Sequence, residues 1–305
     1  MVQECVSLLQ PAATDKSRSV FVDATFGAGG HTRALLEGVP GATVVAIDAD
    51  PAAIERATRL ARDYPAGRLV AQHANFGDLD QALDKSGAES IDGIVYDLGI
   101  SSLQLHDAQR GFSFAGDEPL DMRLDPQAGG PTASELLATL PQDELERMLR
   151  EFGDERHARA IARSIIRRRG RIQGWRTGDL VAAVLSAYGP NPRGRIHPAT
   201  RTFQALRMAV NSDLHNLARS LDQAVHRLRP RGRMVVISFH SAEDRIVKHR
   251  FRSYVQSGSA KLITRKPLRP GTVEVAANVR SRSAKLRAIE RMPQSDASLQ
   301  GRSAD

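Results

Sequence analysis

The chain has 305 residues, a net charge of +8 and a single cysteine, and 41% of its residues are hydrophobic. That length and composition allow one large or two modest domains with a substantial core, and the lone Cys5 excludes a disulfide scaffold and cysteine-based metal clusters. No stretch approaches 18 uninterrupted apolar residues, and the start lacks a basic-then-apolar signal pattern, so we expect a cytoplasmic protein without a membrane partner.

The charge is unevenly distributed along the chain. Residues 1–97 contain 14 Asp and Glu against 8 Lys and Arg, a net charge of −6, so residues 98–305 carry +14. Such asymmetry indicates that the later part meets a polyanion. The alternative is a compositional bias of the source, because 37 of the 43 basic residues are arginine.

A glycine-rich stretch near the start organises the early part of the chain. The apolar run 19–22 predicts a buried strand, and Gly27, Gly29 and Gly30 follow it in the segment D-A-T-F-G-A-G-G-H. Glycine permits a sharp turn and a close approach to a ligand, and a helix over 32–36 would point its amides at that ligand. This pattern predicts a nucleotide site, against the alternative of an ordinary tight turn.

Two further apolar runs end in acidic residues. Residues 43–47 lead to Asp48, at about the separation at which doubly wound folds place a carboxylate on ribose hydroxyls, and residues 91–96 lead to Asp97. The glycine spacing is not the G-x-G-x-x-G of dinucleotide sites. A nucleoside that carries an amino acid fits better, because a carboxylate can meet its ammonium group, and this indicates S-adenosylmethionine.

The first hundred residues predict parallel βα units. Strands are expected at 19–22, 43–47, 69–76 and 91–96, and helices at 2–9, 51–61 and 79–83. Phe76, at the end of the third run, either contacts an adenine ring or belongs to the core.

The pattern changes after Ser101. A polar segment without strand or long-helix signal runs to about residue 130, and helical patterns follow. We expect helices at 132–140, 141–152, 155–169 and 177–188, a basic loop at 189–198, one long helix at 200–228, a strand at 234–239 and a hairpin pairing 261–264 with 284–289. Ten arginines lie between Arg147 and Arg176 against three acidic residues, which favours contact with phosphates over a plain solvated face.

Seven motifs in order resemble one protein family. They are D-A-T-F-G-A-G-G-H, D-L-G-I-S-S, R-G-F-S-F, P-L-D-M-R, H-P-A-T-R-T-F-Q-A-L-R, I-S-F-H-S-x-E-D-R-I-V-K and R-S-A-K-L-R. The chain resembles, from about Val2 to Arg291, the bacterial small-subunit ribosomal RNA methyltransferases of the RsmH or MraW type. It departs from their S-S-P-Q-L-D motif, because Leu103 and His106 stand where proline and aspartate are usual.

The resemblance implies a fold and an activity. The fold is an α/β class I, Rossmann-like methyltransferase sheet interrupted by an all-helical domain. We expect methyltransferase parts at 1–104 and 205–291, an RNA-recognising insertion at 105–204 and a disordered tail at 292–305. The implied activity is methylation of the exocyclic N4 amino group of a cytidine in the decoding region of 16S ribosomal RNA, with S-adenosylmethionine as cofactor and the small ribosomal subunit as partner. The sequence does not decide whether the protein forms a homodimer.

The resemblance also implies the residues of the cofactor site. They are Gly29, Gly30, His31, Asp48, Phe76, Asp97 and Gln104. Asp97 is in addition the candidate catalytic residue, because a carboxylate that accepts an N–H bond from the base would localise the nitrogen lone pair. Holding the cofactor's ammonium is an equally supported role for Asp97.

The remaining candidates concern RNA and competing chemistries. The expected phosphate contacts are Arg193, Arg195, His197 and Arg201. Phe112 and Phe114 either stack on the flipped base or pack a domain joint. No histidine pair has zinc-ligand spacing, so we expect no catalytic metal. His240, Ser241 and Asp244 suggest a helix cap rather than a hydrolase triad.

Three other functions stay open from the sequence. One is an RNA-binding ribosome-assembly factor whose cofactor pocket is vestigial. The others are a nicotinamide-dependent dehydrogenase, which lacks the expected glycine spacing, and a DNA amino methyltransferase.

Overall fold

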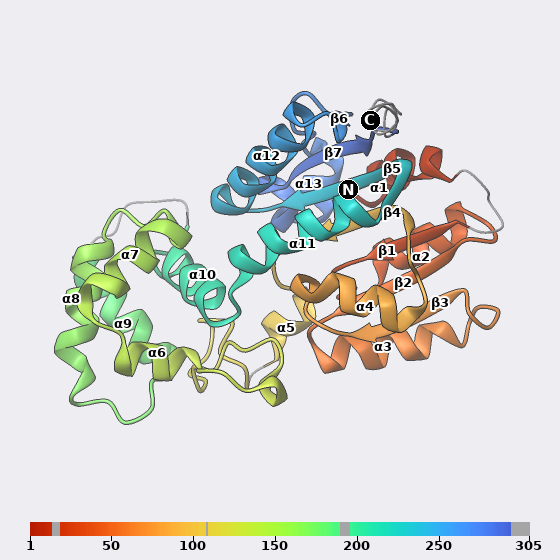
Figure 1. The fold of residues 1–305 in the computed structure, drawn as a ribbon. Helices are drawn as coiled ribbons and strands as arrows, with labels where there is room; N and C mark the ends of the chain where they lie inside the picture. Colours follow the sequence, from red (N-terminus) through yellow and green to blue (C-terminus); the bar gives the residue numbers. More distant parts are fainter. Residues whose placement is uncertain (14–18, 108, 190–195, 294–305) are drawn as a thin grey trace, which may run out of the picture. The chain divides into compact units, whose positions relative to one another are not determined.

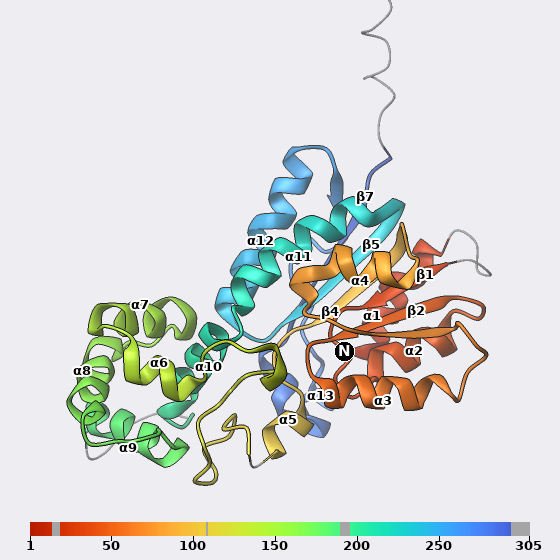
Figure 2. The ribbon, with the colours of Figure 1, turned by 60° about the horizontal axis from the view of Figure 1, so that its bottom comes forward.

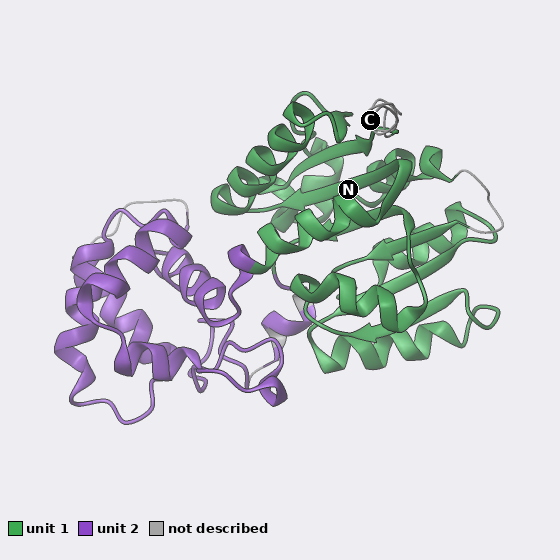
Figure 3. Cartoon of the chain, viewed as in Figure 1, with its two compact units in different colours: residues 1–99, 216–305 green, residues 100–215 purple. Residues whose placement is uncertain are grey.

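The computed structural model describes residues 1–13, 19–107, 109–189 and 196–293, except the side chains of Ser102 and His106. The chain forms two compact units (Figure 3), which we describe separately. Unit 1 contains residues 1–99 and 216–305, and unit 2 contains residues 100–215. The predicted limits of the RNA-recognising insertion, residues 105 and 204, stay a prediction.

Unit 1 is built on a seven-stranded sheet in the order β3-β2-β1-β4-β5-β7-β6 (Figure 1). The strands are β1 (Val20–Asp23), β2 (Thr43–Asp48), β3 (Leu69–His73), β4 (Ile91–Asp97), β5 (Leu228–Ser238), β6 (Ala260–Leu262) and β7 (Lys285–Arg291). The first five are parallel, whereas β7 runs antiparallel to β5 and to β6. The sheet confirms the predicted class I methyltransferase fold and the predicted edge hairpin.

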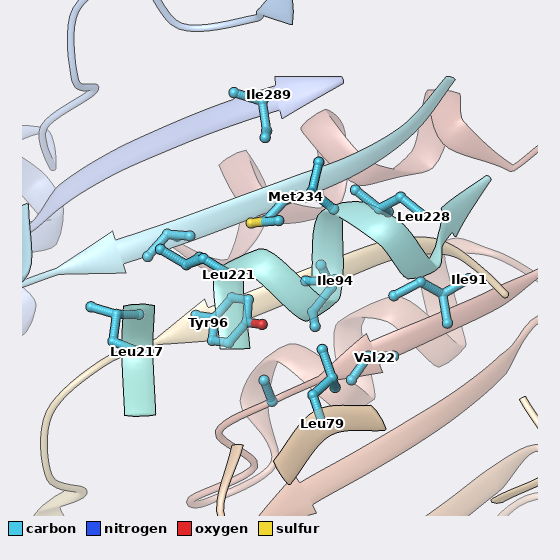
Figure 4. Close-up of a cluster of buried hydrophobic side chains, with 14 of the residues drawn as sticks. Val22, Leu79, Ile91, Ile94, Tyr96, Leu217, Leu221, Leu228, Met234 and Ile289 are labelled. Carbon is cyan, nitrogen blue, oxygen red and sulfur yellow. The ribbon is translucent and has the colours of Figure 1, made fainter. Parts of the chain in front are cut away.

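Helices cover both faces of this sheet, as Figure 2 shows from below. They are α1 (Val2–Leu9), α2 (Gly30–Gly38), α3 (Pro51–Ala61), α4 (Leu79–Ser86), α11 (Asp213–Arg227) and α12 (Ser241–Gln256). The short helix α13 (Thr272–Ala277) contributes no buried residue. One core lies under α4, α11 and α12, where Leu79, Tyr96 and Leu221 are fully buried (Figure 4). The other lies under α1, α2 and α3. The parallel strands are therefore buried on both faces, which explains their nearly continuous apolar sequences.

Several predicted elements of unit 1 differ in their limits, such as β5, which was expected to begin at 234 and begins at Leu228. The third strand ends at His73, and Phe76 begins a 3₁₀ turn, Phe76–Asp78, in which Asn75 accepts a hydrogen bond from Gly77 N at 2.8 Å. The helix after β5 is capped by His240 and not by Ser241. Its capping box pairs His240 with Glu243, whose Oε2 accepts from His240 N at 3.2 Å.

Unit 2 is helical around a core of its own. Its helices are α5 (Ser102–His106), α6 (Ala133–Thr139), α7 (Gln142–Gly153), α8 (Ala158–Arg169), α9 (Thr177–Tyr188) and α10 (Ala199–Val210). Apolar faces of α6 to α10 pack around the buried Trp175. The segment before α6 is fixed by side chains instead of regular structure, since Arg110 donates to the carbonyls of Arg123 at 2.8 Å and Leu124 at 2.6 Å.

The predicted single helix at 200–228 is wrong, because α10 and α11 are separate helices. Ser212 between them has φ 53°, a left-handed conformation that no helix interior allows. Asn211 leaves the helical pattern to accept from Leu124 N and to donate to Met122 O, both at 2.8 Å. The apolar stripe continues across the break because α10 packs in the core of unit 2 and α11 packs on the sheet.

Candidate functional site

Carboxylates end three neighbouring strands of the sheet. Asp23 ends β1, Asp48 ends β2 and Asp97 ends β4, and these strands lie in the order β2-β1-β4. Because the strands are parallel, their carboxyl ends meet at one edge, where open α/β sheets bind ligands. The predicted position of Asp48 and Asp97 at successive strand ends is therefore observed.

Asp23 shapes the turn that follows β1. Its side chain is fully buried and accepts hydrogen bonds from Thr25 N at 3.2 Å and from Thr32 N and Oγ1 at 3.1 and 2.7 Å. Burial raises the pKa of this carboxyl. Asp23 thus ties the start of the glycine turn to the first turn of α2. Asp23 had no predicted role, although the two threonines that follow it are a signal for this hydrogen bonding.

The glycine turn rests on the end of β2. Gly27 N donates to Asp48 Oδ2 at 2.7 Å, and Phe26 N donates to Ile47 O at 3.0 Å. Gly29 has φ 81°, and a Cβ there would lie 2.7 Å from the Phe26 ring. A Cβ on Gly30, the first residue of α2, would meet nothing within 4 Å. The backbone conformation therefore requires glycine at Gly29, whereas the protein itself leaves open space at Gly30.

Asp48 is held by backbone donors on both oxygens. Besides Gly27 N, Asp50 N donates to its Oδ1 at 2.9 Å. Burial raises the pKa of Asp48 to about 6, although these hydrogen bonds oppose the shift. Each oxygen keeps a further lone pair with which it can accept a hydrogen bond from a ligand hydroxyl.

His31 and Asp97 form a pair at the end of β4. His31 Nε2 lies 3.4 Å from Asp97 Oδ2, and His31 is 7% exposed. Burial acts to lower the pKa of His31, but the Asp97 carboxylate and the neighbouring Cys5 thiol outweigh burial and hold that pKa well above its ordinary value. The backbone of Asp97 is fixed through its N–H, which donates to Thr25 Oγ1 at 2.7 Å.

No donor from the described segments reaches the other oxygen of Asp97. Asp97 Oδ1 is buried and has no hydrogen-bond partner among the described residues. A buried acceptor without a donor is unfavourable, so this atom indicates that a donor comes from a ligand. Either an ammonium or an amino group would satisfy it.

Arg56 of α3 also reaches the glycine turn. Its Nε donates to Gly27 O at 3.2 Å, and its Nη2 is buried without a hydrogen-bond partner in the described part of the chain. Arg56 was not predicted from the sequence, because nothing local distinguishes it from the other arginines of α3.

Phe76 and Gln104 are the remaining predicted cofactor contacts. Phe76 is half-buried against the core of unit 1 and meets Tyr96 edge-on, with ring centroids 6.2 Å apart. Gln104 lies in unit 2, where its Oε1 accepts from Ser101 N at 2.8 Å in the capping box of α5. Gln104 therefore has a structural role within unit 2.

The predicted RNA contacts are described only in part. Arg193 and Arg195 lie outside the described residues. The His197 ring stacks on Phe114, with centroids 4.7 Å apart, and Arg201 donates to Asp154 O at 3.2 Å. His197 and Arg201 are both in unit 2.

Other candidates have structural roles. Phe112 is 5% exposed, lies beneath the Arg110 guanidinium and offers no face on which a base could stack. Asp244 binds Arg287 Nε at 2.7 Å and Lys285 Nζ at 2.9 Å, while His240 caps α12. This agrees with the helix cap predicted instead of a hydrolase triad, although the cap is His240.

These features together fit a nucleoside that carries an amino acid. The open space at Gly30 admits a ligand against the backbone, and the charged end of β2 suits ribose hydroxyls. The unpartnered oxygen of Asp97 suits an ammonium or amino group. S-adenosylmethionine carries each of these groups.

Comparisons with known proteins agree with this geometry. A model described as the MraW methylase family matches residues 1–292. A ribosomal RNA small subunit methyltransferase H of Methylobacterium nodulans is 48% identical over 292 residues, covering 89% of this chain and 84% of that one. A protein of the same name from Thermomicrobium roseum is 48% identical over 288 residues, covering 89% and 87%.

Solved structures show a more distant similarity. A ribosomal RNA methylase from Streptococcus thermophilus matches with a TM-score of 0.47 and 11% identity over 96% of both chains. A putative methyltransferase from Streptococcus mutans, solved in complex with SAH, matches with a TM-score of 0.44 and 10% identity, covering 95% of this chain and 97% of that one. No helix within the described segments is long and apolar enough to cross a membrane.

Proposed function

This chain belongs to the MraW methylase family, whose members depend on S-adenosylmethionine, and we propose that it methylates the N4 amino group of a cytidine in the decoding region of 16S ribosomal RNA. Within the chain, the observation that carries the proposal is the buried, unpartnered Oδ1 of Asp97 beside an open glycine turn. It supplies an acceptor for an amino group where a methyl donor fits.

Asp97 is the residue we assign to the chemistry. The N4 lone pair of cytosine is delocalised into the ring, so the amino group is a weak nucleophile. Asp97 Oδ1 accepts one N–H of the amino group, which localises the lone pair, stabilises the positive charge that develops on nitrogen and lets the carboxylate take the proton that the methylated nitrogen loses. Alignment of the nitrogen with the methyl carbon supplies the remaining part of the rate enhancement. The sulfonium of S-adenosylmethionine, when bound, supplies the methyl group.

His31 and Thr25 position this carboxylate. The protonated His31 ring holds Oδ2 at 3.4 Å, and Thr25 Oγ1 fixes the backbone N–H of Asp97 at 2.7 Å. Because Oδ2 and the backbone of Asp97 are both held, the position of Oδ1 is fixed as well. A positioned acceptor stabilises the transition state more than a mobile one does, because it does not have to reorganise during the reaction.

The cofactor is held by the edge of the sheet. We assign the ribose hydroxyls to Asp48 and the amino-acid part to the backbone at Gly29 and Gly30. Phe76, which is half-buried and meets the Tyr96 ring edge-on, is assigned to the adenine.

The RNA is assigned to basic side chains of unit 2. Arg159, Arg163 and Arg167 follow each other at four-residue spacing on α8, are exposed and form no ion pair with any described residue. Adjacent like charges on a helix destabilise it, and binding a phosphate removes that repulsion. Arg193 and Arg195 extend the same assignment.

The test is a comparison of methylated nucleotides. N4-methylcytidine is mapped in small-subunit RNA from cells with and without the gene, and labelled methyl transfer is measured on subunits, on naked RNA and on duplex DNA. The proposal requires one cytidine whose methylation depends on the gene. If calorimetry finds no binding of S-adenosylmethionine, a ribosome-assembly factor with a vestigial pocket is the better description.

A further inference from the structure

A strongly basic pocket in unit 1 is lined by α12, by the end of β6 with the segment that follows it, and by β7. Its volume is about 220 Å³. Five cationic side chains line it: Lys248 and Arg252 from α12, Arg265 and Lys266 from the segment after β6, and Arg287 from β7. No acidic side chain lines it.

The charge of this pocket is largely uncompensated. Of the five, Arg287 alone has an acidic partner in the described part of the chain, Asp244, and it shares that partner with Lys285. The other four cations form no ion pair within the described residues. Lys248 and Arg252 stand four residues apart on one helix, a like-charge spacing that destabilises a free helix. Folded surfaces usually mix charges, so this concentration indicates an anionic ligand.

The backbone that carries the pocket is fixed. Ile263 N and Thr264 N donate to Ala288 O at 3.0 and 3.2 Å, and Leu268 N donates to Leu286 O at 2.9 Å. Arg265 and Lys266 are thus held on a short segment that is tied to β7 at both ends. Cations on a fixed backbone lose less entropy when they bind than cations on a free loop.

The strand register relates this pocket to the methyl-transfer site. Tyr96 of β4 pairs with Val236 of β5, which pairs with Arg287 of β7. Tyr96 precedes Asp97, so the backbone of Arg287 lies two strands, about 10 Å, across the same end of the sheet. Side chains alternate along a strand, so Arg287 projects on the α12 face with Tyr96 and Val236, whereas Asp97 lies in register with Ile237 and Leu286 of the other core. An RNA strand with its target base at Asp97 therefore has to pass over the carboxyl end of the sheet to enter this pocket.

We propose that this pocket binds a backbone phosphate of the RNA substrate, and that this phosphate belongs to a nucleotide near the target cytidine and not to the target itself. The cations surround the phosphate, and Leu262 and Pro267 line the apolar part of the pocket against which the sugar packs. This inference rests on the proposed RNA substrate. It adds a contact from the methyltransferase unit itself to those assigned to unit 2.

The test compares two double variants of equal charge change. Arg265→Gln with Lys266→Gln removes two pocket cations. Arg59→Gln with Arg62→Gln removes two exposed arginines of α3 and its C-terminal end that have no ion pair among the described residues. Binding of a labelled transcript of the decoding region is measured at several KCl concentrations. We expect the pocket variant to bind about tenfold more weakly at low salt and its salt slope to flatten by about 0.7 for each phosphate that it no longer neutralises.

The control variant should keep the wild-type slope, and both variants should keep the affinity for S-adenosylmethionine. Equal slopes for the two variants, with wild-type RNA binding intact, overturn this inference and leave the proposed function standing. If the wild-type chain neither binds nor methylates RNA, the proposed function itself fails.

Lysine footprinting gives a readout that is independent of activity. Acetylation of Lys248 and Lys266 is followed by mass spectrometry, with the exposed Lys85 of α4 as reference. Bound transcript should slow acetylation of both pocket lysines and leave Lys85 unchanged. Cytidine 5′-monophosphate at twice its Kd should slow it about threefold, whereas cytidine, which lacks the phosphate, should not. Unprotected pocket lysines in the RNA complex refute the assignment.

Discussion

Substituting Gly30 separates cofactor binding from folding. A Cβ on Gly30 meets no protein atom within 4 Å, and Gly30 is the first residue of α2 with Gly29 as its N-cap. Gly30→Ala should therefore leave the free energy of unfolding unchanged or raise it by about 0.4–1 kcal/mol, because alanine restricts the unfolded chain. If the cofactor lies against this backbone, the added methyl group occupies its space. Overpacking of that kind costs about 1–3 kcal/mol.

That energy corresponds to a loss of about 5- to 150-fold in affinity for S-adenosylmethionine. Gly29→Ala is the matched control. Its φ of 81° and its 2.7 Å approach to the Phe26 ring predict a loss of about 1–3 kcal/mol in stability. Urea unfolding and calorimetry measure both quantities for each variant. An unchanged cofactor affinity in a stable Gly30→Ala protein would refute the assignment of the glycine turn to the cofactor.

Three other predictions address the remaining assignments. Asp97→Asn should lower kcat by about 100- to 1,000-fold, because the charged acceptor for the amino group is lost. If the affinity for S-adenosylmethionine stays unchanged, Asp97 acts on the base, whereas an equal loss of that affinity would assign it to the cofactor's ammonium. An unchanged kcat would exclude Asp97 from catalysis. Because the pKa of Asp48 is about 6, its carboxylate is protonated below that pH. The affinity for S-adenosylhomocysteine, measured by calorimetry from pH 7 to 5, should therefore fall below pH 6, and Asp48→Asn should abolish this dependence. In the protein without ligand, folding raises the pKa of Asp48 above its ordinary value of 3.8, so the folded state binds this proton more tightly than the unfolded state does. The free energy of unfolding should therefore decrease as the pH rises from about 4 to 6 and the proton is lost. Arg193→Ala with Arg195→Ala should weaken RNA binding and flatten its salt dependence while the cofactor affinity stays constant, and an unchanged salt slope would exclude both arginines from phosphate contact.

The ends of the strands could be predicted from sequence because their signals are local. Asp48 and Asp97 each follow directly on an apolar run, and the place of a strand along the chain can be predicted from the residues within it. Asp23 was just as visible, but its role depends on Thr32, nine residues later, being brought back by the turn. The shape of that turn is a tertiary property.

The break between α10 and α11 shows the same limit over a longer distance. Asn211 leaves the helix to bind Met122 and Leu124, which precede it by 89 and 87 residues. The apolar periodicity does not register this interaction, because it continues unchanged through Asn211. Similarly, the pattern S-x-x-D placed the cap of α12 one residue late, since His240 with Glu243 makes the same motif one position earlier.

The neighbouring positions of β4 and β5 explain how this chain tolerates so large an insertion. All of unit 2 is threaded into the single connection between two adjacent parallel strands, and α11 completes that connection as an ordinary crossover helix. Unit 1 contains every strand of the sheet, while unit 2 begins at Ile100 and ends at His215. Under the proposed function, the residues assigned to the RNA in unit 2 are therefore separate in sequence from the strands assigned to the methyl donor.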